Sequence, residues 1–289
     1  MALPALAIYF LFSYAPMYGI IIAFKKFNYR DGIFGSPWNG FKNFVFYFTT
    51  DDFTRTTFNT LWINFNNILW ETVLAVVFAI FLNEIRNNSM KKVYQILMFL
   101  PYFFSAIIIG KFVSMLFSID YGVINHALEA LGNQPVDWYL KPEYWVKILV
   151  GAHLWKHVGY SVIIYIATIT GIDSELFEAS AIDGATRFQQ IRYVTMPHLI
   201  PVVIILVLLS IGKIFFGEFD LIYAVTSNNG ALIPTTDVIE TYIYRCVSTG
   251  LQDFGILGAI GLYQSVVGFI LVLGSNLAIK KYDKDYSLF

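Results

Sequence analysis

Six apolar stretches, each long enough to cross a lipid bilayer, constrain this chain more than any other feature. A membrane-spanning helix needs about 20 mostly apolar residues to cross roughly 30 Å of hydrocarbon. The stretches lie near 2–24, 58–83, 93–118, 145–171, 198–223 and 254–279. Only 13% of the 289 residues are charged, against about 25% in soluble domains. We therefore predict an all-α polytopic membrane protein with six transmembrane helices, forming one transmembrane domain over 1–289.

The first apolar stretch is predicted to be a retained helix and not a signal peptide. It has no basic segment before it and no small-residue cleavage site, and its apolar run is too long. The sequence begins almost inside this helix, which leaves room for a segment upstream of Met1. Basic residues are divided evenly between the two sets of expected loops, so the positive-inside rule does not decide the orientation.

Several functional classes are disfavoured by composition. A net charge of -1 argues against a nucleic-acid partner, which would require a basic face. The single cysteine, Cys246, excludes an intrachain disulfide and disfavours a thiolate metal cluster. The chain has no Gly-rich phosphate loop followed by Lys-Ser/Thr, so we expect it neither to hydrolyse ATP nor to bind a cofactor itself.

The connection over 172–197 has a clear helical pattern. Asp173 or Ser174 can cap a helix N-terminus, and Gly184 can take the left-handed conformation that ends a helix. A second helical run follows until Pro197, which lacks a backbone donor. We expect a short helix, a glycine turn and a second helix leading into the fifth span. A helix-turn-helix at a membrane surface is suited to contact by a partner from the water side.

The residues of this connection resemble a known family motif. Glu178-Ala179-Ser180, three residues, Gly184, nine residues and Val194-Thr195-Met196-Pro197 are similar to the "EAA" loop of binding-protein-dependent ABC importer permeases. The family pattern is E-A-A, three residues, G, nine residues, I-x-L-P, so the departures are Ser180, Val194 and Met196. The carbohydrate-uptake branch is resembled at 40–44, 59–61, 120–125 and 240–245. Its polysaccharide-importer subgroup, which includes alginate-importer permeases, is resembled at 15–19 and 35–38.

The resemblance implies the transmembrane domain of a type I ABC importer, driven by ATP, in a bacterial inner membrane. The expected substrate is a carbohydrate, in particular an oligosaccharide such as the acidic alginate. The implied partners are a second permease subunit in a heterodimer, a dimer of ATPase subunits that holds ATP and Mg, and an extracytoplasmic solute-binding protein. The short helix would couple to the ATPase on the cytoplasmic side. The implied coupling residues are Glu178, Ala179, Ser180, Asp183, Gly184, Ala185 and Pro197.

Polar side chains within the apolar stretches suggest a substrate pathway. Ionisable groups are costly in hydrocarbon, so they usually face a bundle interior or a water-filled cavity. Lys111 and Lys213 would suit a carboxylate-bearing oligosaccharide, or they would pair internally with an acid such as Glu71, Glu218 or Asp220; both alternatives stay open. Aromatic faces would stack on sugar rings. The candidate pathway residues are Asn67, Lys111, Trp155, Tyr160, Lys213, Phe216 and Gln264.

Two histidines on the fourth apolar stretch have metal-ligand spacing. His153 and His157 lie one helical turn apart. Leu154 stands where a zinc-peptidase motif has glutamate, and the sequence suggests no third ligand, so we predict no metal site. Lys156 between them belongs to a W-K-x-x-G stretch that resembles the family, which favours a structural role over ligand binding.

Two rival functions are weaker. An ion-coupled secondary transporter of a small polar solute would contain repeated halves with helices broken at matching positions, and 1–140 shows no convincing repeat in 150–289. An intramembrane enzyme would require a nucleophile or a metal set within the spans, and no strong set is present.

Overall fold

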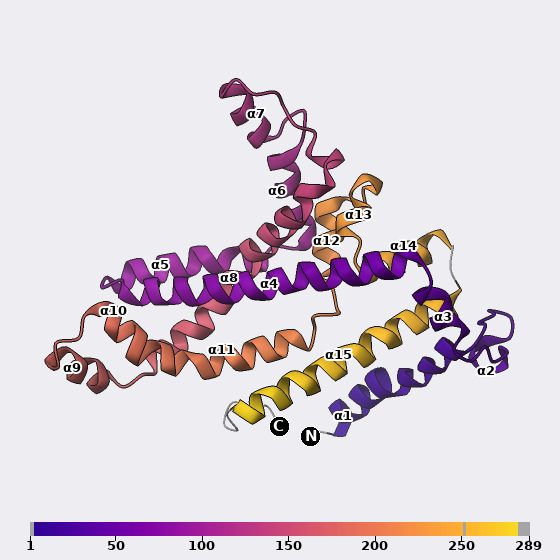
Figure 1. The fold of residues 1–289 in the computed structure, drawn as a ribbon, viewed down its shortest axis with the longest axis horizontal. Helices are drawn as coiled ribbons and strands as arrows, with labels where there is room; N and C mark the ends of the chain where they lie inside the picture. Colours follow the sequence, from indigo (N-terminus) through magenta and orange to yellow (C-terminus); the bar gives the residue numbers. More distant parts are fainter. Residues whose placement is uncertain (1–2, 251–252, 283–289) are drawn as a thin grey trace.

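The computed structural model describes residues 3–250 and 253–282 as a bundle of helices (Figure 1). The start of the first predicted span, at residue 2, lies outside the described residues. No β-strand occurs within the described ranges, which confirms the all-α prediction. Three long helices, α4, α11 and α15, run side by side roughly along the longest axis of the molecule.

The long helical elements have the following bounds: Leu3–Phe24, in which α1 is Leu3–Tyr9, α4 Asp51–Glu84, α5 Asn88–Phe99, α6 Ala106–Phe117, α8 Trp145–Thr170, α11 Met196–Ile211 and α15 Phe254–Tyr282. Shorter helices connect them: α2 Gly32–Gly35, α3 Lys42–Phe48, α7 Val123–Ala130, α9 Ser174–Ile182, α10 Arg187–Gln190, α12 Phe219–Thr226, α13 Ile233–Thr236 and α14 Ile239–Thr249.

Length and apolarity account for four or five of the six predicted spans. Four single helices are long and apolar enough to cross a membrane: Pro4–Phe24, Asp51–Glu84, Arg187–Ile211 and Phe254–Lys281. The segments Asn88–Phe103 and Ala106–Phe117 qualify only as a pair bent by 101°. The remaining predicted span, 145–171, corresponds to α8. This helix has 26 residues but is less apolar than the four helices above because it carries Lys156 and two histidines. Much of α8 is buried by protein, so lipid does not have to cover its polar residues.

Two of the predicted spans were wrong as continuous helices. The stretch 93–118 bends at Phe104, whose backbone is extended with ψ of 135°, and Ser105 then caps the new helix by accepting from the Ile108 N–H. Pro101 lies just before the bend, where its missing N–H weakens the helix. The stretch 198–223 also breaks, because α11 ends at Ile211 and α12 begins only at Phe219.

Side chains from neighbouring helices satisfy the backbone exposed by this second break. Asn64 on α4 donates its side-chain amide to the carbonyl oxygens of Ile214 and Phe216 at 2.8 and 3.2 Å. Gln264 on α15 donates to the Phe215 carbonyl at 2.7 Å. Non-helical backbone at membrane depth is tolerated only where such partners exist. Side chains of α4 and α15 therefore stabilise the non-helical backbone of this break.

The core is centred on α8. One buried cluster joins α8 to α4, α6 and α12 around the fully buried Trp145, whose indole N–H donates to the Trp138 carbonyl at 2.6 Å. A second cluster joins α4, α8 and α11, where the buried Ala75 and Ala79 let α4 and α8 approach closely. A third joins α3, α14 and α15.

Candidate functional site

The short helix α9 lies at one end of the molecule beside α10 (Figure 1). The Asp173 side chain caps it by accepting a hydrogen bond from the Glu175 N–H at 3.0 Å. Gly184 follows in the left-handed conformation, with φ of +79°, which confirms the predicted turn. No residue of α9 is buried, and Ile182 is 86% exposed. An apolar side chain so exposed at the end of the bundle offers a surface for another protein.

The residues implied as coupling residues gather on and after this helix. Glu178, Ala179, Asp183 and Gly184 are exposed, Ser180 and Ala185 are half-buried, and the exposed Pro197 lies further on, in α11.

One residue that the sequence analysis did not single out ties α9 to α10. The amide nitrogen of the buried Gln190 donates to the Ser180 hydroxyl at 2.9 Å and to the Phe177 carbonyl at 3.2 Å. Ser180 in turn donates to the Phe177 carbonyl at 2.8 Å. Ser180, a departure from the family's alanine, thus forms part of a joint that holds the two helices as one unit.

We expect Gln190→Ala to loosen α9 without affecting the spans. The substitution removes the two hydrogen bonds from Gln190 to α9, each with a net contribution of about 0.5–1.5 kcal/mol, and a third, accepted from Arg187 within the same turn at 3.3 Å. Hydrogen exchange of the α9 amides should therefore be faster by about tenfold. Ser180→Ala is the matched control: it leaves the bond from Gln190 to Phe177 and should have a smaller effect. Unchanged exchange in Gln190→Ala would show that this joint does not hold α9.

The helix does not end at Pro197, contrary to the sequence prediction. The chain continues as a helix from Arg187 to Ile211, with one wider turn at Ile191–Thr195 that has π-helical hydrogen bonding. In such a turn the backbone hydrogen bonds join residues five positions apart. This shifts the bonding pattern close to Pro197, which lacks an N–H, so the helix continues past the proline. The segment that follows the Gly184 turn is therefore one continuous helix, from Arg187 to Ile211, that leads into a membrane span.

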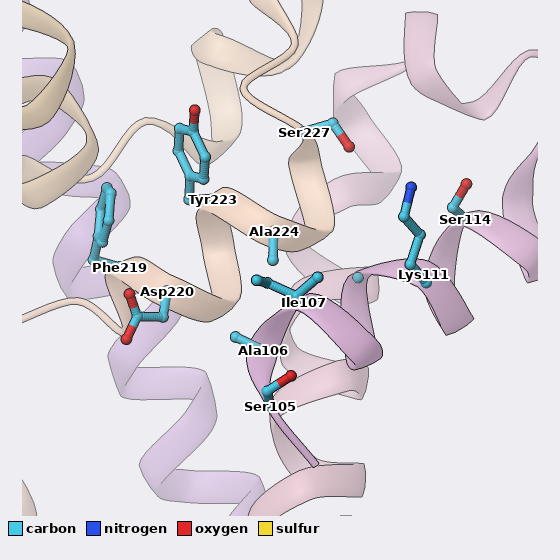
Figure 2. Close-up of a pocket in the computed structure, with 11 residues that line it drawn as sticks. Ser105, Ala106, Ile107, Lys111, Ser114, Phe219, Asp220, Tyr223, Ala224 and Ser227 are labelled. Carbon is cyan, nitrogen blue, oxygen red and sulfur yellow. The ribbon is translucent and has the colours of Figure 1, made fainter. Parts of the chain in front are cut away.

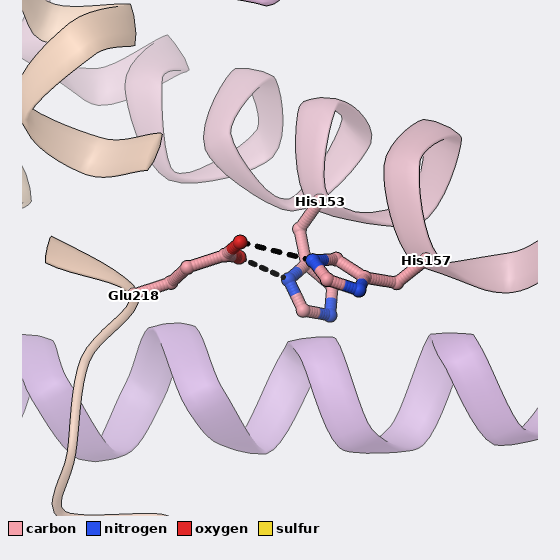
Figure 3. A group of neighbouring side chains, drawn as sticks. All are labelled: His153, His157 and Glu218. Atoms are coloured by element: carbon pink, nitrogen blue, oxygen red, sulfur yellow. Dashed lines mark hydrogen bonds and ion pairs between the residues drawn. The ribbon is translucent and has the colours of Figure 1, made fainter. Parts of the chain in front are cut away.

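Polar side chains meet between α4, α8 and the break after α11 (Figure 3). Glu218 lies 2.9 Å from His153 Nδ1, 2.9 Å from His157 Nε2 and 3.1 Å from Lys156 Nζ. Glu71 on α4 lies 3.0 Å from His153 Nε2 and accepts from Ser161 Oγ at 2.6 Å. The ion pair of Lys156 with Glu218 gives this lysine a structural partner. We call these six residues the α8 polar cluster.

A cavity of about 410 Å³ opens beside this cluster. Three predicted pathway residues, Asn67, Lys213 and Phe216, line it together with Glu71, His153 and Glu218. Asn67 is buried, and its side-chain oxygen has no hydrogen-bond partner within the described residues. The lining thus combines a lysine with an amide oxygen that is buried and has no partner among the described residues.

A second cavity, of about 540 Å³, separates α6 from α12 and contains Lys111 (Figure 2). Ser114, Asp220 and Tyr223 also line it. The helices approach closely at its floor, where a Cβ on Gly110 would lie 2.4 Å from the Ala224 carbonyl oxygen. Over 3–250 and 253–282, neither Lys111 nor Lys213 forms an ion pair.

The other predicted pathway residues lie elsewhere. Trp155 packs against Phe104 and Phe112, with ring centroids 6.1 and 5.5 Å apart. Tyr160 stacks on Tyr102 at 4.9 Å. Gln264, which supports the break after α11, also donates to Glu240 at 3.0 Å. Only three of the seven pathway residues thus share one cavity.

An ion-pair network that the sequence analysis did not predict joins α4 to the segment after α12. The Asp237 carboxylate, whose side chain is 1% exposed, accepts from Arg245 at 2.6 and 3.0 Å and from Arg55 at 3.1 Å. Thr241 donates to it at 2.9 Å. Asp237 and Arg55 are 182 positions apart, so no local sequence pattern could indicate this pair.

Comparison with known proteins defines the class. Residues 71–280 match the family "Binding-protein-dependent transport system inner membrane component". The chain belongs to this family. It is a multi-pass permease subunit of an ABC transporter and not itself an enzyme, which confirms the resemblance seen in the sequence.

Individual relatives cover almost the whole chain. Protein LplB of Bacillus subtilis (strain 168) is 31% identical over 98% of this chain and 88% of its own length. The polygalacturonan/rhamnogalacturonan transport system permease protein YteP of the same organism is 32% identical over 99% and 88%. A bacterial ABC transporter involved in the import of the acidic polysaccharide alginate has a chain that is 31% identical, with a TM-score of 0.89 over 97% of this chain and 94% of that chain. A second structure, of a bacterial alginate ABC transporter in complex with alginate pentasaccharide-bound periplasmic protein, gives 0.88 at 30% identity over 98% and 93%. The fold is therefore that of a type I importer permease.

Proposed function

We propose that this chain is the permease subunit of an ATP-driven importer of an acidic oligosaccharide, and that α9 docks on a separate ATPase. The observation that carries the proposal is the geometry of α9. This capped helix has no buried residue, and Gln190 ties it to α10. The helix that begins with α10 is continuous with a membrane span. A rigid helix transmits a displacement that a flexible loop would absorb.

The proposed assembly contains further subunits. A second permease would complete the pathway, two ATPase subunits would bind ATP and Mg, and an extracytoplasmic protein would deliver the sugar. The periplasmic protein present in one similar transporter supports the last of these. The α9 end would face the cytoplasm of a bacterial inner membrane, since that is where an ATPase would find ATP.

Two observations favour an acidic sugar. Similar proteins carry names that refer to polygalacturonan, rhamnogalacturonan or alginate, and polygalacturonan and alginate are chains of uronic acids. In this chain, Lys111 and Lys213 each line a cavity and form no ion pair with any described residue. An ammonium group without a carboxylate partner at membrane depth is stabilised by an anionic ligand.

We expect Lys213→Met and Lys111→Met to weaken uptake of an acidic oligosaccharide and to leave the yield of the complex unchanged. A hydrogen bond to a charged group contributes about 1.5–3 kcal/mol, so the apparent affinity should fall by at least tenfold. Uptake by proteoliposomes is the measurement, with a neutral oligosaccharide of equal length as the comparison. Lys141→Met, an exposed lysine outside both cavities, is the matched control.

The outcomes separate the alternatives. A loss of complex yield would indicate that the lysines pair internally and would contradict the substrate assignment. Equal losses for acidic and neutral sugars would contradict recognition of charge. Uptake driven by an ion gradient in the absence of the ATPase would instead favour an ion-coupled secondary transporter.

A further inference from the structure

The α8 polar cluster has the composition of a transition-metal site. His153 and His157 project from successive turns of α8, and Glu218 reaches them from the break after α11 (Figure 3). One ligand atom from each of the three residues lies within 4.8 Å of the other two. Glu218 is the third ligand that the sequence could not provide, because it lies 61 and 65 positions away from the two histidines.

The separations suit a small divalent ion. Zinc is bound by histidine nitrogen and carboxylate oxygen at about 2.0–2.2 Å with tetrahedral geometry, which puts neighbouring ligand atoms about 3.3–3.6 Å apart. Both histidine nitrogens lie 2.9 Å from a Glu218 oxygen. Each histidine–carboxylate separation would lengthen by about half an ångström to admit the ion, and the ligand atoms of the three residues already lie within 4.8 Å of one another.

His153 has a carboxylate at both ring nitrogens. Its Nδ1 faces Glu218 at 2.9 Å and its Nε2 faces Glu71 at 3.0 Å. Each contact requires a proton or a metal between nitrogen and oxygen, because two lone pairs would repel. A carboxylate on the far nitrogen of a metal-bound histidine is a recurrent arrangement that fixes the ring and raises its basicity. Glu71, itself held by Ser161 at 2.6 Å, has this position.

The charges and the access route fit a cation. With both histidines neutral, Lys156 is the one ammonium paired with the carboxylates of the cluster among the described residues; Lys213 lines the same cavity without pairing with them. A cation held by Glu218 and the histidines would balance the second carboxylate. His153, His157 and Glu218 all line the cavity of about 410 Å³, which gives an ion a route of entry and leaves space for water as a fourth ligand. Lys156 lies 3.1 Å from Glu218 and competes for the same carboxylate.

We propose that His153, His157 and Glu218 bind zinc or a similar divalent first-row transition metal, with Glu71 as the positioning residue behind His153. The ion joins α8 to the break between α11 and α12, so it lies between the span that continues from α9 and the core helix. This site is independent of which sugar is transported.

Metal binding by the full chain in its complex tests the proposal. The complex is purified with a tag that contains no histidine, stripped with chelator and titrated with zinc, then with cobalt. We expect one equivalent of zinc that is absent in His153→Ala/His157→Gln, and visible absorption bands of tetrahedral cobalt. His198→Ala is the matched control and should bind normally, because this exposed histidine lies outside the cluster and bonds to the Val194 carbonyl of its own helix at 2.7 Å. Binding that persists in the double variant, or wild-type protein without the cobalt bands, would overturn the proposal.

Two single variants distinguish a metal site from a cluster held by protons alone. Glu71→Gln should keep the stoichiometry and weaken zinc binding by about 10–100-fold. Lys156→Met should tighten zinc binding, because it removes the cation that competes for Glu218. If the cluster holds only protons, neither variant binds zinc and neither does the wild type. The wild-type cobalt spectrum can refute the proposal without any variant. The test therefore does not depend on whether the mutants fold.

Discussion

Gly184→Val should sharply reduce the stimulation of ATP hydrolysis by substrate in the assembled complex. Gly184 has φ of +79°, a conformation that costs a residue with a Cβ about 1–2 kcal/mol or more. That strain would lower the population of the native turn by a factor of about 5–30. Apart from the adjacent Asp183 and Ala185, no heavy atom of the described residues lies within 4 Å of a Cβ built on Gly184, so the effect would come from the backbone and not from a clash. The measurement is substrate-stimulated ATPase activity in proteoliposomes.

Gly184→Asn is the control for this prediction. Asparagine tolerates the left-handed conformation, and the space around the glycine is open, so this variant should keep most of the stimulation. Both variants should insert normally, because the turn lies outside the apolar spans. Wild-type stimulation in Gly184→Val would show that the shape of this turn does not matter for coupling.

Asp237→Ala should lower the thermal stability of the complex more than any other single change discussed above. It leaves Arg55 and Arg245 without their shared carboxylate, and removing one partner of a buried ion pair costs about 3–5 kcal/mol. We expect a loss near the lower limit, because the two arginine side chains are 28% and 21% exposed. The midpoint of thermal unfolding in detergent should fall by several degrees. Asp120→Ala removes an exposed acid and should leave the midpoint unchanged; equal midpoints in both variants would contradict the role of Asp237.

The fold class and the short helix α9 could be predicted because their signals are local. Apolar stretches report on transfer of side chains into lipid, and Asp173 and Gly184 specify the two ends of α9 by their own conformations. The breaks at Phe104 and after Ile211 were not predicted. Hydropathy reports how apolar a segment is and not whether its helix bends or breaks. The hydrogen bonds of the backbone after Ile211 are made by Asn64 and Gln264, which lie on helices distant in the sequence.

In the candidate site, too, features with a local sequence signal could be predicted, and features that depend on distant residues could not. His153 and His157 were noticed because they lie one turn apart in the sequence. Glu218 was considered as a partner for a lysine, yet its position against both histidines depends on how α8 packs against the break. Gln190 carries no motif of its own, and its contact with Ser180 exists only because the turn at Gly184 folds α10 back onto α9.

Site-specific cross-linking from α9 tests the central claim most directly. A photoreactive residue replaces Ile182, which is 86% exposed, and the assembled complex is irradiated. The control position is Leu131, 77% exposed, beyond α7 on an arm away from α9 (Figure 1). We expect a covalent adduct with the ATPase subunit from position 182 and none from position 131. An ATPase adduct from position 131 with none from position 182 would contradict that claim.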